Sequence, residues 1–317
     1  MLILTAGVLI TPVLLSPWPG FRAPLSTVVE ASNGELLGAR IADDGQWRFP
    51  PSDSIPEKFK KAILTFEDRY FYWHPGINPV SIIRALILNI KAGEIVSGGS
   101  TISMQVARLA RGIKPRTYPG KIIEMLSALK LELFASKNKI LKIYSANAPF
   151  GGNTVGLDAA AWRYTGKSPA DITWAEAAAL AVLPNSPSLV FPGKNQEILK
   201  TRRDELLKKL FEREYFDSLT LILALDESLP GEPEPLPALA PHLTDYFFIN
   251  KKGERIRTSI DPEIQERASE IFKIHQKDLS GNFINNSAGI IADVETGKVL
   301  AYIGNCTSQQ TGDHSEN

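Results

Sequence analysis

Residues 67–78 of this chain read EDRYFYWHPGIN, and they begin with an acidic pair, Glu67 and Asp68. Apolar side chains surround the pair in the sequence: Ile63, Leu64, Phe66, Tyr70, Phe71 and Trp73. A partly buried carboxylate has a raised pKa, because desolvation disfavours its charged form. Such a group suits general acid or base catalysis near neutral pH. The alternative is that Glu67 or Asp68 forms a salt bridge with Arg69 or Arg84.

A polar segment follows about twenty residues later. Residues 98–105 read GGSTISMQ, and Arg108 comes three positions after Gln105. Glycines allow close approach of the backbone to a ligand, and hydroxyl, amide and guanidinium groups suit phosphate or sugar oxygens. The alternative is an ordinary helix start with Ser100 or Thr101 as its cap.

A basic cluster lies just downstream. It comprises Arg111, Lys114, Arg116 and Lys121, and a further carboxylate, Glu124, follows Lys121 by three residues. Such a cluster is usually a solvated helix face, but beside an acidic pair it also suits a pyrophosphate. Two separated glutamates fit glycosyl chemistry, in which one carboxylate deprotonates the attacking hydroxyl.

The surrounding pattern predicts a mainly α protein with short β segments. Residues 25–50 read as strands around Asn33-Gly34, and the pattern from about 55 to 215 is helical. The Pro-rich segment within 216–254 reads as a stiff linker. A further helix from 261 to about 276 precedes a second hairpin. The expected helices of the long region are 78–93, 121–134, 138–147, 155–165, 173–183 and 195–213, and Thr173 and Glu176 are expected to form the capping box of the helix at 173–183.

Composition excludes several classes of protein. The 317 residues contain 35 Lys+Arg and 35 Asp+Glu, so the formal net charge is zero and a general nucleic-acid binder is not expected. A single cysteine excludes an intramolecular disulfide and a cysteine-built metal site. Four scattered histidines show no zinc-binding spacing, so no protein metal site is expected.

The apolar run of residues 2–15, LILTAGVLITPVLL, is shorter than the roughly 18–20 residues that span a bilayer. Two interpretations stand: a partial transmembrane anchor within 1–19, or a buried core segment. Pro17, Trp18 and Pro19 follow like an interfacial boundary and favour the anchor.

The motifs together resemble the family 51 peptidoglycan glycosyltransferases, the lysozyme-like domains of class A penicillin-binding proteins. The resemblance rests on EDRYFYWHPGIN, GGSTISMQ, KIIE and KNKILKIY, which occur in this order. It implies a lysozyme-like all-α glycosyltransferase domain at 51–215, preceded by a small β collar at 25–50. It also implies the α+β start of a penicillin-binding transpeptidase domain at 255–317, where IRTSIDPEIQERA and AGIIADVETGKVLAYIGN lie.

The resemblance implies a role for each matching residue. Glu67 would be the base that deprotonates the 4-hydroxyl of the acceptor lipid II, and Glu124 would lie near the donor pyrophosphate or its metal ion. The other matches would shape the cleft or bind substrate: Asp68, Phe71, His74, Gly76, Ser100, Thr101, Gln105, Arg108, Arg116, Lys121, Lys137 and Asn147. His74 is expected to order its loop rather than to bind a metal ion.

One motif departs from the family pattern, which has tyrosine, leucine and asparagine in succession. Here Tyr144 is followed by Ser145 and Ala146, and Asn147 comes one place late. Either this branch of the family varies here, or a hydrogen bond of the cleft is lost.

The resemblance implies no transpeptidase activity for this chain. In the family a Ser-x-x-Lys nucleophile follows the C-terminal hairpin, and the sequence shows none there. Ser127-x-x-Lys130 and Ser136-x-x-Lys139 match the short pattern, but they lie inside the glycosyltransferase region.

The implied function is polymerisation of lipid II at the periplasmic side of a bacterial inner membrane, with a single-pass anchor. The implied partners are lipid II, the growing lipid-linked glycan strand, the membrane and other cell-wall synthesis proteins, with no nucleic acid. Pyrophosphate chemistry also favours Mg²⁺ at the donor, although no motif specifies it. Two alternatives stand: a lysozyme-like hydrolase, against which the basic cluster argues, and a catalytically silent scaffold.

Overall fold

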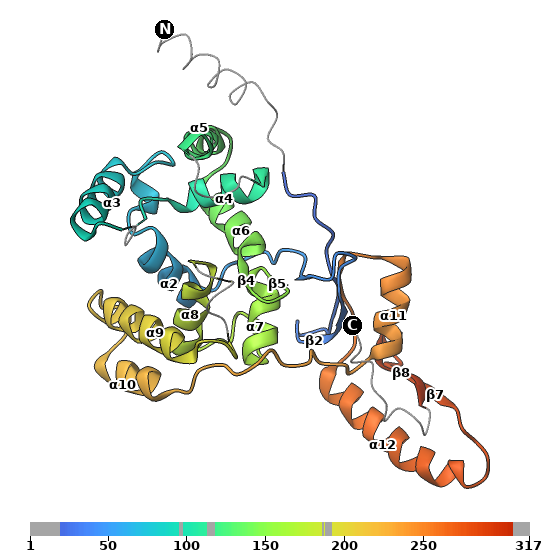
Figure 1. Ribbon diagram of the computed structural model, residues 1–317. Helices are drawn as coiled ribbons and strands as arrows, with labels where there is room; N and C mark the ends of the chain where they lie inside the picture. Colours follow the sequence, from blue (N-terminus) through green and yellow to red (C-terminus); the bar gives the residue numbers. More distant parts are fainter. Residues whose placement is uncertain (1–19, 95–97, 113–117, 186, 188–191, 307–317) are drawn as a thin grey trace. The chain divides into compact units, whose positions relative to one another are not determined.

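The computed structural model describes residues 20–94, 98–112, 118–185, 187 and 192–306 (Figure 1). They form two compact units, which are described separately below. The first unit contains 51–234 and the second contains 24–50 together with the chain from 235 onward. The expected mainly α class is confirmed. The predicted anchor at 1–19 lies outside the described residues, among which no helix is long and apolar enough to cross a bilayer.

Helix α8 (Trp174–Val182) is the core helix of the first unit and packs against α2 (Glu57–Glu67) and α9 (Gln196–Phe211) (Figure 1). Its sequence is alanine-rich, and every residue from 175 to 182 is buried. Small side chains on all faces allow neighbouring helices to approach closely. The helix starts with the expected capping box, in which Thr173 Oγ1 accepts from Glu176 N at 3.1 Å and Glu176 Oε2 accepts from Thr173 N at 2.7 Å.

The other predicted helices of this unit are present, with boundaries that differ by up to three residues: α5 begins at Tyr118 rather than 121, and α7 begins at Leu157 rather than 155. Asn78 caps α3 (Pro79–Ala92), and Gly93 ends it in the left-handed conformation at φ 72°. The remaining elements are η1 (Phe71–Trp73), α4 (Ile102–Arg111), α5 (Tyr118–Phe134), α6 (Lys137–Asn147), β4 (Pro149–Gly151), β5 (Thr154–Val155), α7 (Leu157–Thr165), η2 (Leu183–Asn185) and α10 (Ser218–Asp226).

The second unit combines segments from both sides of the first unit in the sequence. Strand β1 (Thr27–Glu30) pairs antiparallel with β2 (Leu36–Arg40) and parallel with β6 (Arg255–Arg257). The predicted hairpin is therefore present, but it belongs to one sheet with a strand more than 200 residues away. Local patterns do not reveal this pairing, because a parallel partner comes from a long crossover. The short β3 (Trp47–Arg48) also lies within the 25–50 region that reads as strands.

The predicted linker at 216–254 is largely folded, which differs from the expectation. Its first part contains α10, capped by the Asp217 side chain, which accepts from Thr220 N at 2.8 Å. Its last part contains α11 (Pro241–Asn250), which packs on β2 in the second unit. The boundary between the units falls at Glu234 and Pro235. Pro241, which lies within the predicted linker, occupies the first turn of a helix, a position that suits proline.

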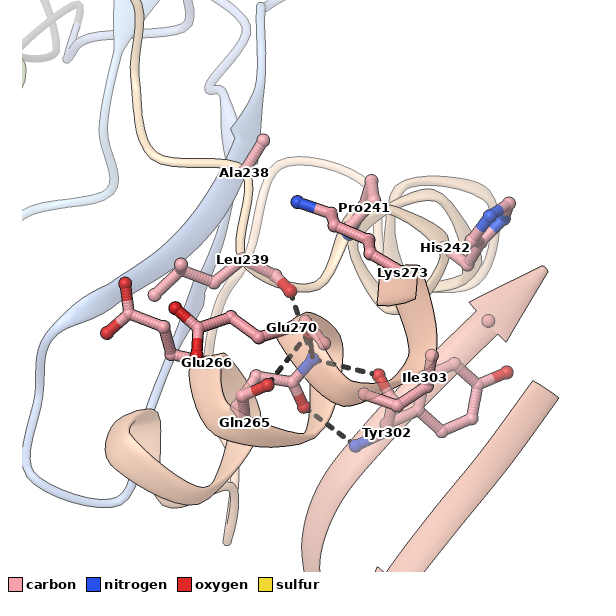
Figure 2. Close-up of a pocket in the computed structure, with 12 residues that line it drawn as sticks. Ala238, Leu239, Pro241, His242, Gln265, Glu266, Glu270, Lys273, Tyr302 and Ile303 are labelled. Carbon is pink, nitrogen blue, oxygen red and sulfur yellow. Dashed lines mark hydrogen bonds between the residues drawn. The ribbon is translucent and has the colours of Figure 1, made fainter. Parts of the chain in front are cut away.

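The C-terminal part of the second unit is a helix packed on a hairpin. Helix α12 (Pro262–Ser280) contacts β8 (Val299–Cys306), which pairs with β7 (Ser287–Ala292) as expected. Gln265 is buried, and its amide donates to Leu239 O and Tyr302 O and accepts from Tyr302 N (Figure 2). These groups line a cavity of about 280 Å³ that includes none of the predicted site residues.

Candidate active site

Glu67 is the last residue of α2, and its carboxylate lies at the centre of the candidate site. The helix buries Phe59, Ala62 and Ile63, which directs its C-terminal end into the unit. Burial raises the pKa of the Glu67 carboxyl by desolvation, and the nearby Asp68 raises it further. Hydrogen bonds from Gln105 and Asn185 and the charge of Arg108 lower the pKa, but desolvation exceeds them.

The two oxygens of Glu67 have different surroundings. Gln105 Nε2, on α4, donates to Oε2 at 2.6 Å. Oε1 is buried and accepts no hydrogen bond of normal geometry from the described residues, although the Asn185 amide lies near enough to lower the pKa. One oxygen is therefore held and the other is left to accept a proton. Neither Glu67 nor Asp68 pairs with Arg69 or Arg84 in the described part of the chain, so the salt-bridge alternative is not what the structure has.

Asp68 orders the loop that follows α2. Its two carboxylate oxygens each lie 3.0 Å from His74 Nε2, and Oδ2 accepts from Ile102 N at 3.1 Å. Gly76 N donates to His74 Nδ1 at 3.2 Å. Both ring nitrogens of His74 thus have partners within the protein and hold the loop in place.

Thr101 both caps α4 and ties it to this loop. Its Oγ1 accepts from Met104 N at 3.2 Å and donates to Gly76 O at 2.6 Å. The cap interpretation of this segment is therefore confirmed for Thr101, and the same hydroxyl also positions the loop. Gly76 has φ 92°, and a Cβ there would lie 2.9 Å from Ala128 O, so only glycine fits.

The donor-side residues form a second hydrogen-bonded group. Lys121 Nζ donates to Ser100 Oγ at 2.5 Å and to Glu124 Oε2 at 2.8 Å. Glu124 is buried, whereas the Lys121 side chain is 42% exposed. Arg108 is partly exposed on α4 and acts electrostatically on Glu67. The predicted Arg116, with Lys114, lies outside the described residues.

The remaining predicted residues have mainly structural contacts. Lys137 Nζ lies 4.5 Å from the centroid of the buried Phe71 ring. Asn147 Nδ2 donates to Ile143 O of its own helix at 2.9 Å, and no described hydrogen bond joins it to Glu67 or Gln105. Tyr144, in the unusual fourth motif, is fully buried, and its hydroxyl lies 3.5 Å from Gln105 Oε1.

The donors present do not form a metal site by themselves. Among the described residues, no group of three or more His, Cys, Asp and Glu side chains could hold a metal ion. The Glu124 carboxylate already accepts from Lys121. The expectation of Mg²⁺ at the donor is thus without a set of protein ligands, and no step below depends on it.

Sequence reasoning missed two residues near this site, Asn185 and Glu132. Asn185 lies in the PNSPS segment, where its neighbours read as a helix end. Glu132 lies on a helix face, where a glutamate usually indicates solvent exposure, but here it accepts hydrogen bonds from Ser103 and Lys137.

Comparisons with known proteins agree with these motifs. The transglycosylase family model matches residues 33–211. Penicillin-binding protein 1C of Escherichia coli K12 is 38% identical over 259 residues, covering 81% of this chain and 33% of that protein. Penicillin-binding protein 1A of Aquifex aeolicus is 35% identical over 279 residues, covering 84% and 37%. The chain thus spans about a third of the length of these relatives.

A solved structure, penicillin-binding protein 1A of Haemophilus influenzae, is also similar. It is 17% identical, with a TM-score of 0.36, covering 81% of this chain and 30% of that one.

Proposed function

Because the chain belongs to the transglycosylase family, we propose that it is a peptidoglycan glycosyltransferase that polymerises lipid II into β-1,4-linked glycan strands. The proposal rests on the state of the Glu67 carboxyl. Burial raises its pKa, and Gln105 holds one of its two oxygens by a hydrogen bond. A base with a raised pKa accepts a proton more readily near neutral pH than an exposed glutamate does.

Glu67 accepts the proton of the acceptor 4-hydroxyl on its Oε1. As the proton leaves, the hydroxyl oxygen of the acceptor attacks the anomeric carbon of the donor. A new C–O bond forms with inversion, and the bond from the anomeric carbon to the pyrophosphate oxygen breaks. Undecaprenyl pyrophosphate leaves with the bonding electrons. Gln105 fixes the orientation of the carboxylate, which keeps Oε1 directed to the hydroxyl.

The second group supports the leaving pyrophosphate. Lys121 is held between Ser100 and Glu124, and its partly exposed ammonium supplies a fixed positive charge. Arg108 adds a guanidinium on the neighbouring helix, where it suits phosphate oxygens. Glu124 acts here by orienting Lys121.

The exposed apolar side chains of α3 support a membrane-associated site. Only Ala85 of this helix is buried, and its exposed apolar residues are Val80, Ile83, Leu86, Ile87, Leu88 and Ile90; the basic residues Arg84 and Lys91 are exposed beside them. A contiguous apolar helix face of this kind suits the interface of a bilayer. Attachment to the inner membrane with the site on the periplasmic side brings it to lipid-linked substrates, and other cell-wall synthesis proteins would act alongside it.

Product analysis separates this proposal from the hydrolase and the scaffold. The purified chain is incubated in parallel with labelled lipid II and with finished peptidoglycan. The proposal predicts glycan polymer from lipid II and no release of short sugars from peptidoglycan. Release of short sugars would favour the hydrolase, and a folded protein without either activity would favour the scaffold.

A further inference from the structure

Glu132 on α5 joins side chains from two other helices. Ser103 Oγ of α4 donates to Glu132 Oε1 at 2.5 Å, and Lys137 Nζ of α6 donates to the same oxygen at 2.7 Å. The Glu132 side chain is 9% exposed, and Ser103 is fully buried. A charge this enclosed is stable only when it is paired and hydrogen-bonded. One carboxylate oxygen therefore fixes the positions of three helices relative to one another.

Lys137 extends this connection to the loop that follows α2. Its Nζ also donates to His74 O at 2.6 Å and lies beside the Phe71 ring. Gly76, in the same loop, packs on Glu132, since a Cβ there would lie 2.9 Å from Glu132 Cγ. Asp68 holds the loop through the side chain of His74, and the Glu132–Lys137 pair holds it through the backbone oxygen of His74.

The contacts of Lys137 leave little of its ammonium for a substrate. An ammonium has three donors, and two of them serve Glu132 and His74 O. The paired Glu132 carboxylate also neutralises the charge that a phosphate would need. The phosphate-binding role that the motif resemblance implies for Lys137 therefore conflicts with its surroundings.

We propose that Glu132 and Lys137 form a positioning clamp that holds the 71–76 loop and α4 in the arrangement the reaction requires. The proposal rests on the proposed function. Ser103 lies two positions before Gln105 on α4, and Gln105 orients the Glu67 carboxylate. When the clamp is lost, the loop and α4 shift and Glu67 no longer meets the hydroxyl in a productive geometry.

Steady-state kinetics on lipid II test the clamp with Glu132→Gln, Lys137→Met, the double variant and a matched control, Lys167→Met. The control breaks another Lys–Glu pair of the same unit, Lys167–Glu176, at 2.8 Å. Each single clamp variant is expected to lower kcat about tenfold and to change KM less than about twofold. The kcat of the double variant is expected to be no lower than that of the less active single variant, since Glu132 and Lys137 act together as one clamp. The double variant also contains no unpaired charge, so it serves if a single variant fails to fold.

The opposite pattern would overturn the proposal. If Lys137 is a phosphate ligand, Lys137→Met raises KM, whereas Glu132→Gln releases the ammonium and lowers KM. Unchanged kcat in the folded double variant would likewise contradict a positioning role.

Hydrogen–deuterium exchange gives a readout that does not depend on catalysis. Backbone amides of 71–78 are expected to exchange faster in the clamp variants than in the wild type and in Lys167→Met. Unchanged exchange would overturn the clamp. A wild type that does not polymerise lipid II would instead refute the proposed function, and the exchange experiment would still decide whether the clamp holds the loop.

Discussion

The hydrogen bond from Gln105 to Glu67 leads to a quantitative prediction for the variant Gln105→Met, which keeps the side-chain length and removes the amide. Gln105 Nε2 donates to Glu67 Oε2 at 2.6 Å and lowers the pKa of that carboxyl. A hydrogen bond to a charged group contributes about 1.5–3 kcal/mol, and one pKa unit corresponds to about 1.4 kcal/mol. At the lower end of that range, loss of this hydrogen bond should raise the pKa of Glu67 by about one unit in Gln105→Met.

The sign of the effect follows from the role of Glu67 as a base. Only the deprotonated carboxylate accepts the proton, so kcat/KM rises with pH through the pKa of Glu67. In Gln105→Met the acid limb of this profile should move about one unit to higher pH. At a fixed pH on that limb the rate should fall about tenfold, with a smaller loss above it.

The assay is the rate of lipid II polymerisation measured across the acid limb for the wild type and the variant. Gln196→Met is the matched control, since Gln196 donates to Pro230 O in the same unit and has no described contact with Glu67. An acid limb that stays in place in Gln105→Met, or that moves to lower pH, would refute the reasoning.

Three further predictions follow from the geometry. Because the pKa of Glu67 is raised in the folded state, the stability of the wild type falls as pH rises from the unfolded pKa through the folded one. Glu67→Gln removes this carboxylate, so it should raise Tm at pH 8 and change Tm little at pH 4. A lower Tm of the variant at pH 8 would contradict this. Gly76→Ala places a Cβ against Ala128 O at a positive φ, so the free energy of unfolding should fall by about 1–3 kcal/mol in thermal unfolding. An unchanged Tm would argue against the tight fit. The triple variant Ile83→Ser, Leu86→Ser and Ile90→Ser should lower the affinity of the chain for anionic vesicles, measured by co-sedimentation, about tenfold or more. The reason is that an aliphatic side chain contributes about 1.5–3 kcal/mol when it is fully buried in the apolar layer. Undiminished binding would exclude α3 as a lipid contact.

The local features of the fold were predictable from the sequence, whereas the long-range ones were not. Asn78 and Gly93 bound α3, and Thr173 and Glu176 form the capping box, because caps depend on residues within one turn. The pairing of β1 with β6 joins residues 227 positions apart, such as Val28 and Arg255, so no local pattern indicates it.

The candidate site shows the same division. The partial burial of the Glu67 carboxylate could be predicted from the apolar residues around it in the sequence. The short loop from Asp68 to His74 could be predicted in the same way. The Gln105 contact with Glu67 comes from the packing of α4 against α2 and required the fold. Glu132 was missed because a glutamate in a predicted helix gives no sign that Ser103 and Lys137 enclose it.

The rate of labelled lipid II polymerisation by Glu67→Gln, compared with the wild type, tests the role of Glu67 as the base most directly. Glu57→Gln is the matched control, because it makes the same change at an exposed position of the same helix. The account predicts polymer from the wild type and from Glu57→Gln, and a rate at least about 100-fold lower from folded Glu67→Gln. Equal rates for Glu67→Gln and the wild type would contradict it.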